Sequence, residues 1–369
     1  AHLSGGMKRR LDIACALIHN PQVLILDEPT GVLTPTEADQ LFRILEQLRD
    51  EGKTIILITH KLREIMAITD TVSVMRRGTM VGTVATKDTS PDKLAEMMVG
   101  RRVLLQVEKT QAKPGDKVLE VESLSVTDDI GVPRVKNVSL DVRAGEIVGI
   151  AGVAGNGQSQ LLEAISGMFP PLLGEVRING KKVVFSSSGV ADEVRRMGLA
   201  HVPEDRHKMG LVTTFEEWEN SMLGYEDDPK YGEGAILSVA DARADAQKRI
   251  EMFDIRPQNP RLKTANFSGG NQQKIVLARE MDRDLDILIV GQPTRGVDIG
   301  AIEFIHKQII ELRDQGKAVL LVSVELDEVR ALSDRVLVMF DGEVVTELPP
   351  TASEKEFGLA MAGLDPAQQ

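Results

Sequence analysis

The chain has 369 residues, of which 42% are hydrophobic and 27% charged, so it is not a mainly disordered protein and its length predicts about two domains. The net charge of −12 argues against a nucleic-acid partner, because such proteins usually present a basic surface. No apolar run approaches the ~20 residues that cross a bilayer as a helix. No signal-peptide pattern is present and the first residue is Ala instead of Met, so we expect a cytoplasmic and incomplete chain.

The first hundred residues alternate between helix and strand patterns. Helices are predicted at residues 5–18, 36–50 and 90–99, and strands at 23–26, 54–59, 72–75 and 80–84. Cys15 lies within the first helix, where we expect a reduced and buried thiol. Asp27 and Glu28 follow the first strand, and His60 follows the second. Ligands of open α/β sheets bind at such carboxyl ends of parallel strands.

The rest of the chain begins with a polar, aperiodic segment at residues 101–117, which we interpret as a linker. Antiparallel strands are predicted at 118–124 and 135–142, a buried strand at 146–151, helices at 160–168 and 238–253, and a further buried strand at 287–290. The predicted division is therefore 1–100, the linker 101–117, a second and complete domain 118–348, and a tail 349–369.

An internal repeat organises the sequence. Ser4-Gly5-Gly6 returns as Ser268-Gly269-Gly270, an offset of 264 (268 minus 4), and Pro29-Thr30 returns as Pro293-Thr294 at the same offset. A register that holds without gaps over about 80 residues indicates tandem duplication. The first copy is then expected to lack its beginning, because the counterpart of residue 118 would precede residue 1.

A glycine-rich turn follows the strand at 146–151. It matches the spacing of a phosphate-binding P-loop except that glutamine stands at the lysine position, and its residues are Gly152, Val153, Ala154, Gly155, Asn156, Gly157, Gln158 and Ser159. Backbone N–H groups of such a loop hold phosphates, and Ser159 would hold Mg²⁺. An ordinary tight strand-to-helix turn is the alternative.

The two copies differ at the strand ends. At the offset of 264, the counterparts of Asp27, Glu28 and His60 in the second copy are Gly291, Gln292 and Val324. A strand-end Asp is a typical Mg²⁺ ligand, and an adjacent Glu can polarise an attacking water. We therefore expect the second site to hold nucleotide but to hydrolyse it poorly, since such losses commonly lower the rate by about 10²–10⁴.

These motifs resemble those of the ABC ATPases. Ser4-Gly5-Gly6 and Ser268-Gly269-Gly270 resemble the signature motif, and Asp27-Glu28 resembles the Walker B pair, with Asp27 as metal ligand and Glu28 as catalytic base. His60 resembles the switch histidine, Glu204 stands where the family has its Q-loop glutamine, and Asp298 resembles a D-loop aspartate. Pro203-Glu204-Asp205-Arg206 narrows the resemblance to fused double ATPase subunits of bacterial simple-sugar and nucleoside importers.

The resemblance implies an α/β P-loop NTPase fold with a mixed sheet, an antiparallel β-subdomain and a helical signature subdomain, present as a tandem duplicate. It also implies ATP and Mg²⁺ as cofactors, with each ATP held between one copy's P-loop and the other copy's signature motif. The competent site would use the first copy's P-loop, which is expected to precede residue 1, with Asp27, Glu28 and His60, closed by Ser268–Gly270. The degenerate site would use the glycine-rich turn, Gly291 and Gln292, closed by Ser4–Gly6.

The implied partners are integral-membrane permease subunits and, indirectly, an extracytoplasmic solute-binding protein. The protein would lie on the cytoplasmic face of the inner or plasma membrane, as a pseudo-dimer within one full-length chain. This fragment by itself is expected to be inactive, because it lacks the first P-loop. Two alternatives remain at this point: a soluble double-ATPase acting in translation or on nucleic acid, and a regulatory nucleotide-binding module.

Overall fold

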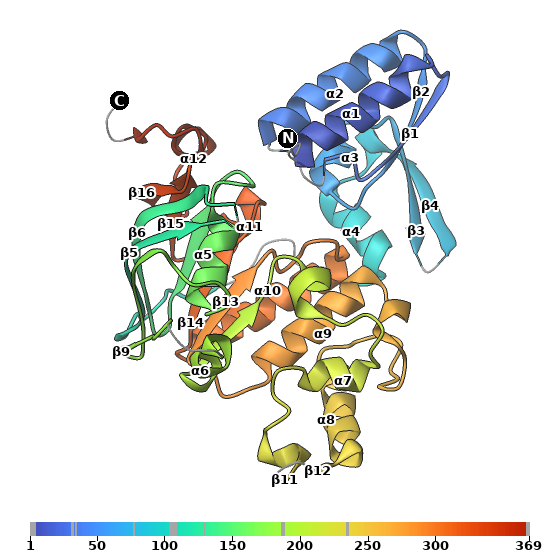
Figure 1. Ribbon diagram of the computed structural model, residues 1–369. Coiled ribbons are helices and arrows are strands. Elements are labelled where there is room, and N and C mark those ends of the chain that lie inside the picture. The colour runs from blue at the N-terminus through green and yellow to red at the C-terminus, as the bar shows by residue number, and fades with distance from the viewer. Residues whose placement is uncertain are drawn as a thin grey trace. The chain divides into compact units, whose positions relative to one another are not determined.

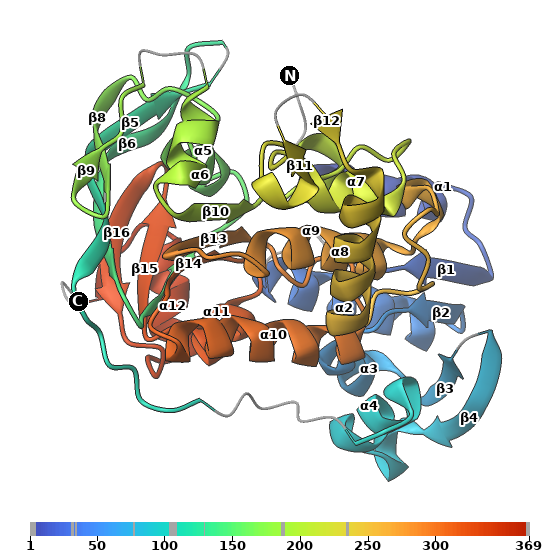
Figure 2. The same cartoon turned by 90° about the horizontal axis from the view of Figure 1, so that it is seen from below.

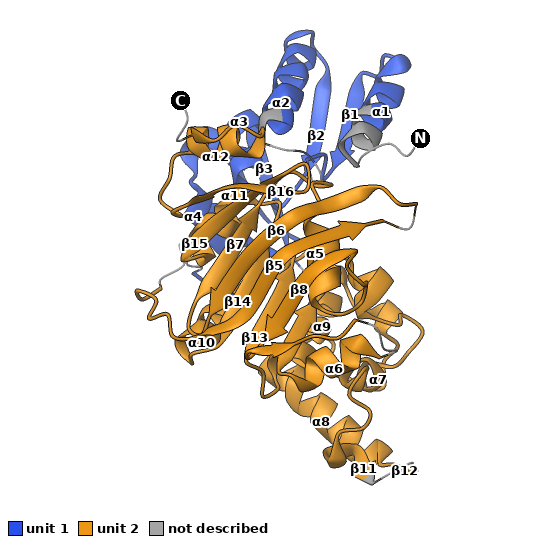
Figure 3. Cartoon of the chain, turned by 60° about the vertical axis from the view of Figure 1, so that its left-hand side comes forward, with its two compact units in different colours: residues 1–106, 298–303 blue, residues 107–297, 304–369 orange. Residues whose placement is uncertain are grey.

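The computed structural model describes residues 5–30, 33, 35–76, 78–102, 109–128, 130–185, 189–233 and 236–366. The chain divides into two compact units, which Figure 3 colours separately. The first unit comprises residues 1–106 and 298–303, and the second comprises residues 107–297 and 304–369. None of the helices within the described ranges is both long and apolar enough to cross a membrane.

The predicted helices and strands of the first hundred residues are present, and the structure adds a short helix at Leu62–Ile68 that was not predicted (Figure 1). The helices and strands are α1 (Gly5–Ile18), β1 (Val23–Asp27), α2 (Pro35–Asp50), β2 (Thr54–Ile58), α3 (Leu62–Ile68), β3 (Thr71–Arg76), β4 (Thr79–Ala85) and α4 (Pro91–Val99). The strands β1 and β2 pair in parallel, whereas β3 and β4 form an antiparallel hairpin. Local sequence sets the ends of α4, because the Ser90 hydroxyl accepts from the Lys93 amide and Gly100 ends the helix at φ +87°.

The prediction that Cys15 is buried is wrong, because its side chain is exposed. Helix α1 contributes Ile13 to a core that also contains Leu24 and Leu26 of β1 and Leu41 and Leu45 of α2. Residues two positions apart on a helix point to nearly opposite sides, so burial of Ile13 turns Cys15 outward.

The second unit contains most of the remaining elements. They are β5 (Lys117–Thr127), β6 (Pro133–Arg143), β7 (Ile147–Ala151), α5 (Gln158–Ile165), β8 (Leu173–Ile178), β9 (Lys181–Lys182), α6 (Val190–Arg196), β10 (Leu199–Val202), α7 (Glu217–Met222), β11 (Gly232–Glu233), β12 (Ile236–Leu237), α8 (Val239–Met252), α9 (Gly269–Met281), β13 (Ile287–Gly291), α10 (Ile299–Asp314), β14 (Ala318–Val322), α11 (Leu326–Leu332), β15 (Arg335–Phe340), β16 (Glu343–Leu348) and α12 (Glu354–Met361). Helix α12 lies in the segment predicted as a tail, and its Phe357 is buried against Val336 and Val338.

Two large sheets build this unit, in addition to the short antiparallel pair β11–β12. Its described residues form a six-stranded sheet in the order β10-β13-β14-β7-β15-β16, parallel except for β16, and an antiparallel sheet in the order β6-β5-β8-β9. Figure 2 shows α5 on one face of the larger sheet and α11 on the other. Leu337 of β15 joins the core shared with α5 and the smaller sheet, whereas Val336 and Val338 face α11 and α12.

A helical part completes the unit. Helices α7 and α8 bury Trp218 and Met222 against Ala242 and Ala246, and both helices contact α9. The mixed sheet, the antiparallel β-part and the helical part expected from the sequence are therefore all present.

The two units repeat the same elements at a fixed distance along the chain. Strands β1 and β2 correspond to β13 and β14 at an offset of 264 (287 minus 23 and 318 minus 54), and the pairing register is the same, with Val23 opposite Thr54 and Ile287 opposite Ala318. The helices α2 and α3 correspond in the same way to α10 and α11.

Equivalent strand residues differ in burial between the units. Ile25 of β1 is 63% exposed, whereas Ile289 of β13 is fully buried. Ile56 and Ile58 of β2 are exposed too, and their counterparts Leu320 and Val322 are buried. In the second unit β14 pairs with the central strand β7 and the sheet packs on α5, and the described first unit contains no counterpart of β7 or α5.

Candidate functional site

The glycine-rich turn leaves the end of a central strand. Strand β7 is buried throughout and pairs with β14 on one side and β15 on the other. Helix α5 begins at Gln158, directly after Gly157, whose φ is +96°. A Cβ atom at position 157 would lie 2.0 Å from the carbonyl oxygen of Arg134, so only glycine fits there. The turn thus points backbone N–H groups of a helix start out of the sheet edge, an arrangement suited to an anion.

Gln158 takes up a position inside the turn. Its side chain is buried, and its Nε2 donates to the carbonyl oxygen of Val153 at 3.2 Å. Gly152 leaves room for this contact, since a Cβ there would lie 2.3 Å from Gln158 Nε2. The neutral residue at the lysine position therefore braces the turn through a hydrogen bond and supplies no cation.

Ser159 and Glu204 meet beside the turn. The Ser159 hydroxyl donates a hydrogen bond to Glu204 Oε2, and Glu204 reaches it from the segment that follows β10. Burial raises the pKa of the Glu204 carboxyl, while the hydrogen bonds from Ser159 and Gln292 and the charge of Arg295 act in the opposite direction. Two of the predicted nucleotide-site residues are thus in direct contact.

Strand β13 ends at the same place. Gln292 has a φ of +51°, and its backbone N–H donates to the carbonyl oxygen of Val322 at 2.7 Å. Its side-chain Oε1 accepts from the backbone N–H of Val324 at 3.3 Å. A Cβ at Gly291 would lie 2.5 Å from Glu204 Cγ, so the Glu204 side chain occupies the space that a larger residue would need. The structure therefore brings Gly291, Gln292, Glu204 and Ser159 together at one sheet edge.

The strand ends of the first unit carry the charged counterparts. Glu28 follows β1 with a φ of +43°, and its amide donates to the carbonyl of Ile58 at 2.8 Å. His60 follows β2, and its Nδ1–H donates to Glu28 Oε1 at 2.6 Å. Asp27, Glu28 and His60 thus lie at one edge of the β1–β2 pair, as predicted.

Sequence reasoning missed Glu64 of α3. Its buried carboxylate accepts hydrogen bonds from Thr30 Oγ1 and, at 2.8 Å, from Thr59 Oγ1. The only sequence signal was a glutamate four residues after His60, which by itself is typical of any helical first turn. The contact with Thr30 spans 34 residues and cannot be obtained from a local pattern.

The predicted signature turns open helices. Ser268 caps α9, where its Oγ accepts from the backbone N–H of Asn271 at 3.4 Å. Gly269 and Gly270 form the first turn of this helix. Gly5 and Gly6 begin α1, whereas Ser4 lies outside the described residues. Asp298 precedes α10, and its Oδ1 accepts from the Ala301 amide at 3.0 Å.

The donor chemistry beside the turn fits Mg²⁺. Ser159 and Glu204 offer a hydroxyl and a carboxylate oxygen, the ligand types that this cation prefers. Across the part of the chain that the structure describes, no group of three or more His, Cys, Asp or Glu side chains could hold a metal by itself. Such a pair fits a cation whose remaining ligands come from nucleotide phosphates and water.

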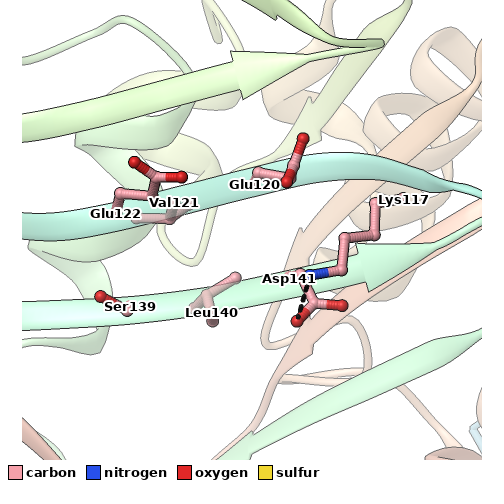
Figure 4. A pocket seen from close by; sticks show the side chains of 7 residues that line it. All are labelled: Lys117, Glu120, Val121, Glu122, Ser139, Leu140 and Asp141. Carbon is pink, nitrogen blue, oxygen red and sulfur yellow. Dashed lines mark ion pairs between the residues drawn. The ribbon is translucent and has the colours of Figure 1, made fainter.

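A separate hollow of about 250 Å³ lies on the β5–β6 surface (Figure 4). Its lining includes Glu120, Glu122 and Asp141, and Lys117 Nζ lies 3.6 Å from Asp141 Oδ1. No residue of the glycine-rich turn or of the β13 end contributes to it. The candidate site is therefore the sheet edge and not this hollow.

Comparison with known proteins agrees with the motifs. A sequence model of the ABC transporter family matches residues 1–31 and 135–295. The chain is 44% identical to the nucleoside import ATP-binding protein NupA of Lactococcus lactis subsp. cremoris, which covers 98% of this chain and 71% of that protein. It is 45% identical to the guanosine import ATP-binding protein NupO of Bacillus subtilis, with the same two coverages.

Another relative is named for a different solute, and a solved structure has a similar fold. The glucose import ATP-binding protein TsgD13 of Haloferax volcanii is 45% identical, over 98% of this chain and 66% of that protein. The chain thus spans about two thirds of the length of these relatives. A solved dimeric ATP-binding cassette in a post-hydrolysis state, bound to ADP and phosphate, aligns with a TM-score of 0.55 and 26% identity, covering 64% of this chain and 100% of that chain.

Proposed function

The chain belongs to the ABC transporter family, whose ATP-binding subunits bind ATP with Mg²⁺ and hydrolyse it, and we propose that it powers an importer of nucleosides or simple sugars. The observation that carries this proposal is the glycine-rich turn after β7, with Ser159 and Glu204 in contact beside it. The import direction and the solute class rest on relatives named for nucleoside, guanosine and glucose import. A soluble factor of translation is not favoured by these relatives.

We propose that the chain carries two copies of one ATPase domain: part of one at 1–100 and a complete one at 118–348, with 101–117 as linker and 349–369 as tail. The element order repeated at an offset of 264 supports this division. In the working protein the two copies would act as a pseudo-dimer within one chain. Its partners would be the membrane permease and, indirectly, an extracytoplasmic solute-binding protein, with the ATPase on the cytoplasmic face.

The copies would divide the chemistry. Glu28 would accept the proton of the attacking water, and the ring of His60, held by Glu28, would present its other nitrogen to the γ-phosphate. When Mg²⁺ is bound, it neutralises charge on the phosphates, and Asp27 in the first copy and Ser159 with Glu204 in the second are the residues that would hold it. In the second copy Gln292 cannot accept a proton, so this site would bind nucleotide with little turnover.

The test compares one position in both copies. In the full product of the gene, assembled with its permease, Glu28→Gln should lower ATP hydrolysis by about 10²-fold or more, because it removes the proton acceptor. Gln292→Glu should leave the rate nearly unchanged, because Gly291 and Val324 still replace the metal ligand and the histidine. If Glu28→Gln hydrolyses ATP at the full rate, the proposed working site is wrong. If the unaltered chain does not bind a fluorescent ATP analogue, the nucleotide site itself is rejected.

A further inference from the structure

Glu64 joins two functional turns of the first unit. Its side chain on α3 is only 4% exposed, and a carboxylate in such a place needs hydrogen-bond donors to offset the loss of water. Both carboxylate oxygens have one: Thr30 Oγ1 donates to Oε1 and Thr59 Oγ1 donates to Oε2 at 2.8 Å. The Thr59 hydroxyl also accepts from the Lys61 amide at 3.1 Å, which fixes the start of α3.

The two threonines lie beside the predicted catalytic groups. Thr30 is two residues after Glu28, and Thr59 directly precedes His60. The contact of 2.6 Å between His60 Nδ1 and Glu28 Oε1 completes a closed ring of side chains and short backbone segments. The ring runs from Glu28 through Thr30, Glu64 and Thr59 to His60 and back. Movement of either turn would therefore strain the hydrogen bonds of the other.

The second unit keeps the glutamate but not the ring. Glu328 lies at the same place on α11 (328 minus 64 is 264) and is also buried. Its Oε1 is 2.8 Å from Nε2 of His306 on α10, and among the described residues its buried Oε2 has no hydrogen-bond partner. The counterpart of His306 in the first unit is Phe42, which offers no polar atom. The ring is thus found in the unit that retains Glu28 and His60.

We propose that Glu64 is a positioning residue for ATP hydrolysis: it ties the turn after β1 to the turn after β2 and so holds the Glu28 carboxylate against His60. This inference rests on the proposed function of the first unit. Glu64 does not touch the reacting atoms. Its effect passes through Thr30 and Thr59, and a loss of alignment by about 1 Å commonly lowers a catalytic rate by about 10²-fold.

Steady-state kinetics of the full gene product with its permease test the proposal. Glu64→Ala should lower kcat by about 10-fold to 10²-fold with KM nearly unchanged, since binding groups stay in place. Glu64→Gln should recover part of the rate, because its amide oxygen accepts from one threonine and its N–H can donate to the other hydroxyl. Glu328→Ala is the matched control in the other unit and should leave kcat within about twofold.

A double-variant comparison checks the route of the effect. If Glu64 acts through Thr30, then Thr30→Val in the Glu64→Ala background should lower kcat little further, whereas independent effects would multiply. Independent effects of the two changes would overturn the proposal. Wild-type kcat in a folded Glu64→Ala variant would overturn it as well, provided that Glu28→Gln abolishes hydrolysis. If Glu28→Gln hydrolyses ATP normally, the proposed function of the first unit fails instead.

Hydrogen exchange gives a readout that needs no turnover and uses the chain as printed. In Glu64→Ala the backbone amides of Glu28, Thr30, Thr59 and His60 should exchange faster together, while those of β1 and β2 keep their rates. The Glu328→Ala chain should show no change in either turn. Faster exchange confined to α3, or spread evenly over residues 5–100, would mean that Glu64 only stabilises the fold, and it would contradict the positioning role.

Discussion

Glu28 and Gln292 have the same backbone conformation in two different settings. Their φ angles are +43° and +51°, and the amide of each donates to the carbonyl of the matching residue on the next strand, Ile58 at 2.8 Å and Val322 at 2.7 Å. A positive φ is unfavourable for residues other than glycine and is often found at functional sites. The second unit has this strained turn although the side chain of Gln292 is neutral. This is expected if nucleotide binding depends on the backbone conformation of the turn.

The first prediction concerns two glycines of the glycine-rich turn that follows β7. Gly155 and Gly157 have nearly equal φ angles, +97° and +96°, but a Cβ at 155 meets nothing within 4 Å, whereas one at 157 lies 2.0 Å from the Arg134 carbonyl oxygen. Gly155→Ala should therefore lower stability only by about 1–2 kcal/mol, the cost of the left-handed conformation. Gly157→Ala should cost clearly more and abolish binding of a fluorescent ATP analogue. Urea denaturation and a binding titration measure both, and equal effects of the two variants would contradict the steric argument.

The second prediction concerns removal of the divalent cation. The Glu204 carboxylate lies against Ser159, where phosphates are expected, so without a cation it should repel them. Chelation with EDTA should weaken binding of an ATP analogue to the chain by about tenfold or more, an effect of at least ~1.4 kcal/mol. In Glu204→Gln, which keeps a hydrogen-bonding group without the charge, EDTA should have a much smaller effect. Glu163→Gln on α5 is the control for loss of a neighbouring carboxylate, and it should respond to EDTA as the unaltered chain does.

The sequence predicted well what depends on local pattern and on the repeat. Apolar runs located the strands β1 and β13, of which β13 is buried throughout and β1 is buried only in part. The offset of 264 matched Asp27 with Gly291, and the structure places each at the end of its strand, opposite Ile58 and Val322 respectively. Exposure of Cys15 was missed because the helical pattern did not reveal which face of α1 the β1 strand covers.

Side-chain contacts between distant segments were beyond the sequence. The Glu64 contact with Thr30 and the insertion of Glu204 beside Gly291 each join residues more than 30 positions apart. No periodicity encodes such pairs, because they depend on how strands are placed next to one another.

The third prediction follows from the unequal burial of equivalent strands. Ile289→Ala should destabilise the second unit by about 2–5 kcal/mol, because it leaves a cavity in a packed core. Ile25→Ala should change stability by no more than about 0.5–1 kcal/mol, because the Ile25 side chain is mostly exposed in this chain. Hydrogen exchange should likewise be faster in β1 and β2 than in β13 and β14. Equal losses of stability in the two variants would show that the exposed face of β1 is covered in solution.

The fourth prediction concerns pH and a buried carboxyl of the helical part. Burial raises the pKa of Glu217 to about 7, while the hydrogen bond from Ser221, at 2.6 Å, and the charge of Arg249 act to lower it. Because an unfolded glutamate titrates near 4.5, the folded chain holds a proton between pH 4.5 and 7 that the unfolded chain has released. The free energy of unfolding should therefore fall as the pH rises through this interval, and the loss should persist above it.

Two variants make this pH effect measurable against the background of all other groups. Glu217→Gln removes the titration, so its free energy of unfolding relative to the unaltered chain should rise between pH 5 and pH 8, by at most about 3 kcal/mol. Ser221→Ala removes a hydrogen bond that favours the charged form, so the pKa of Glu217 should rise further and the loss of stability with pH should become larger. Urea denaturation of the three proteins at both pH values gives the comparison. The contradicting result is a difference in free energy of unfolding between Glu217→Gln and the unaltered chain that is equal at pH 5 and pH 8. That result would mean that Glu217 is already charged in the folded chain at pH 5, because the hydrogen bond from Ser221 and the charge of Arg249 outweigh the effect of burial.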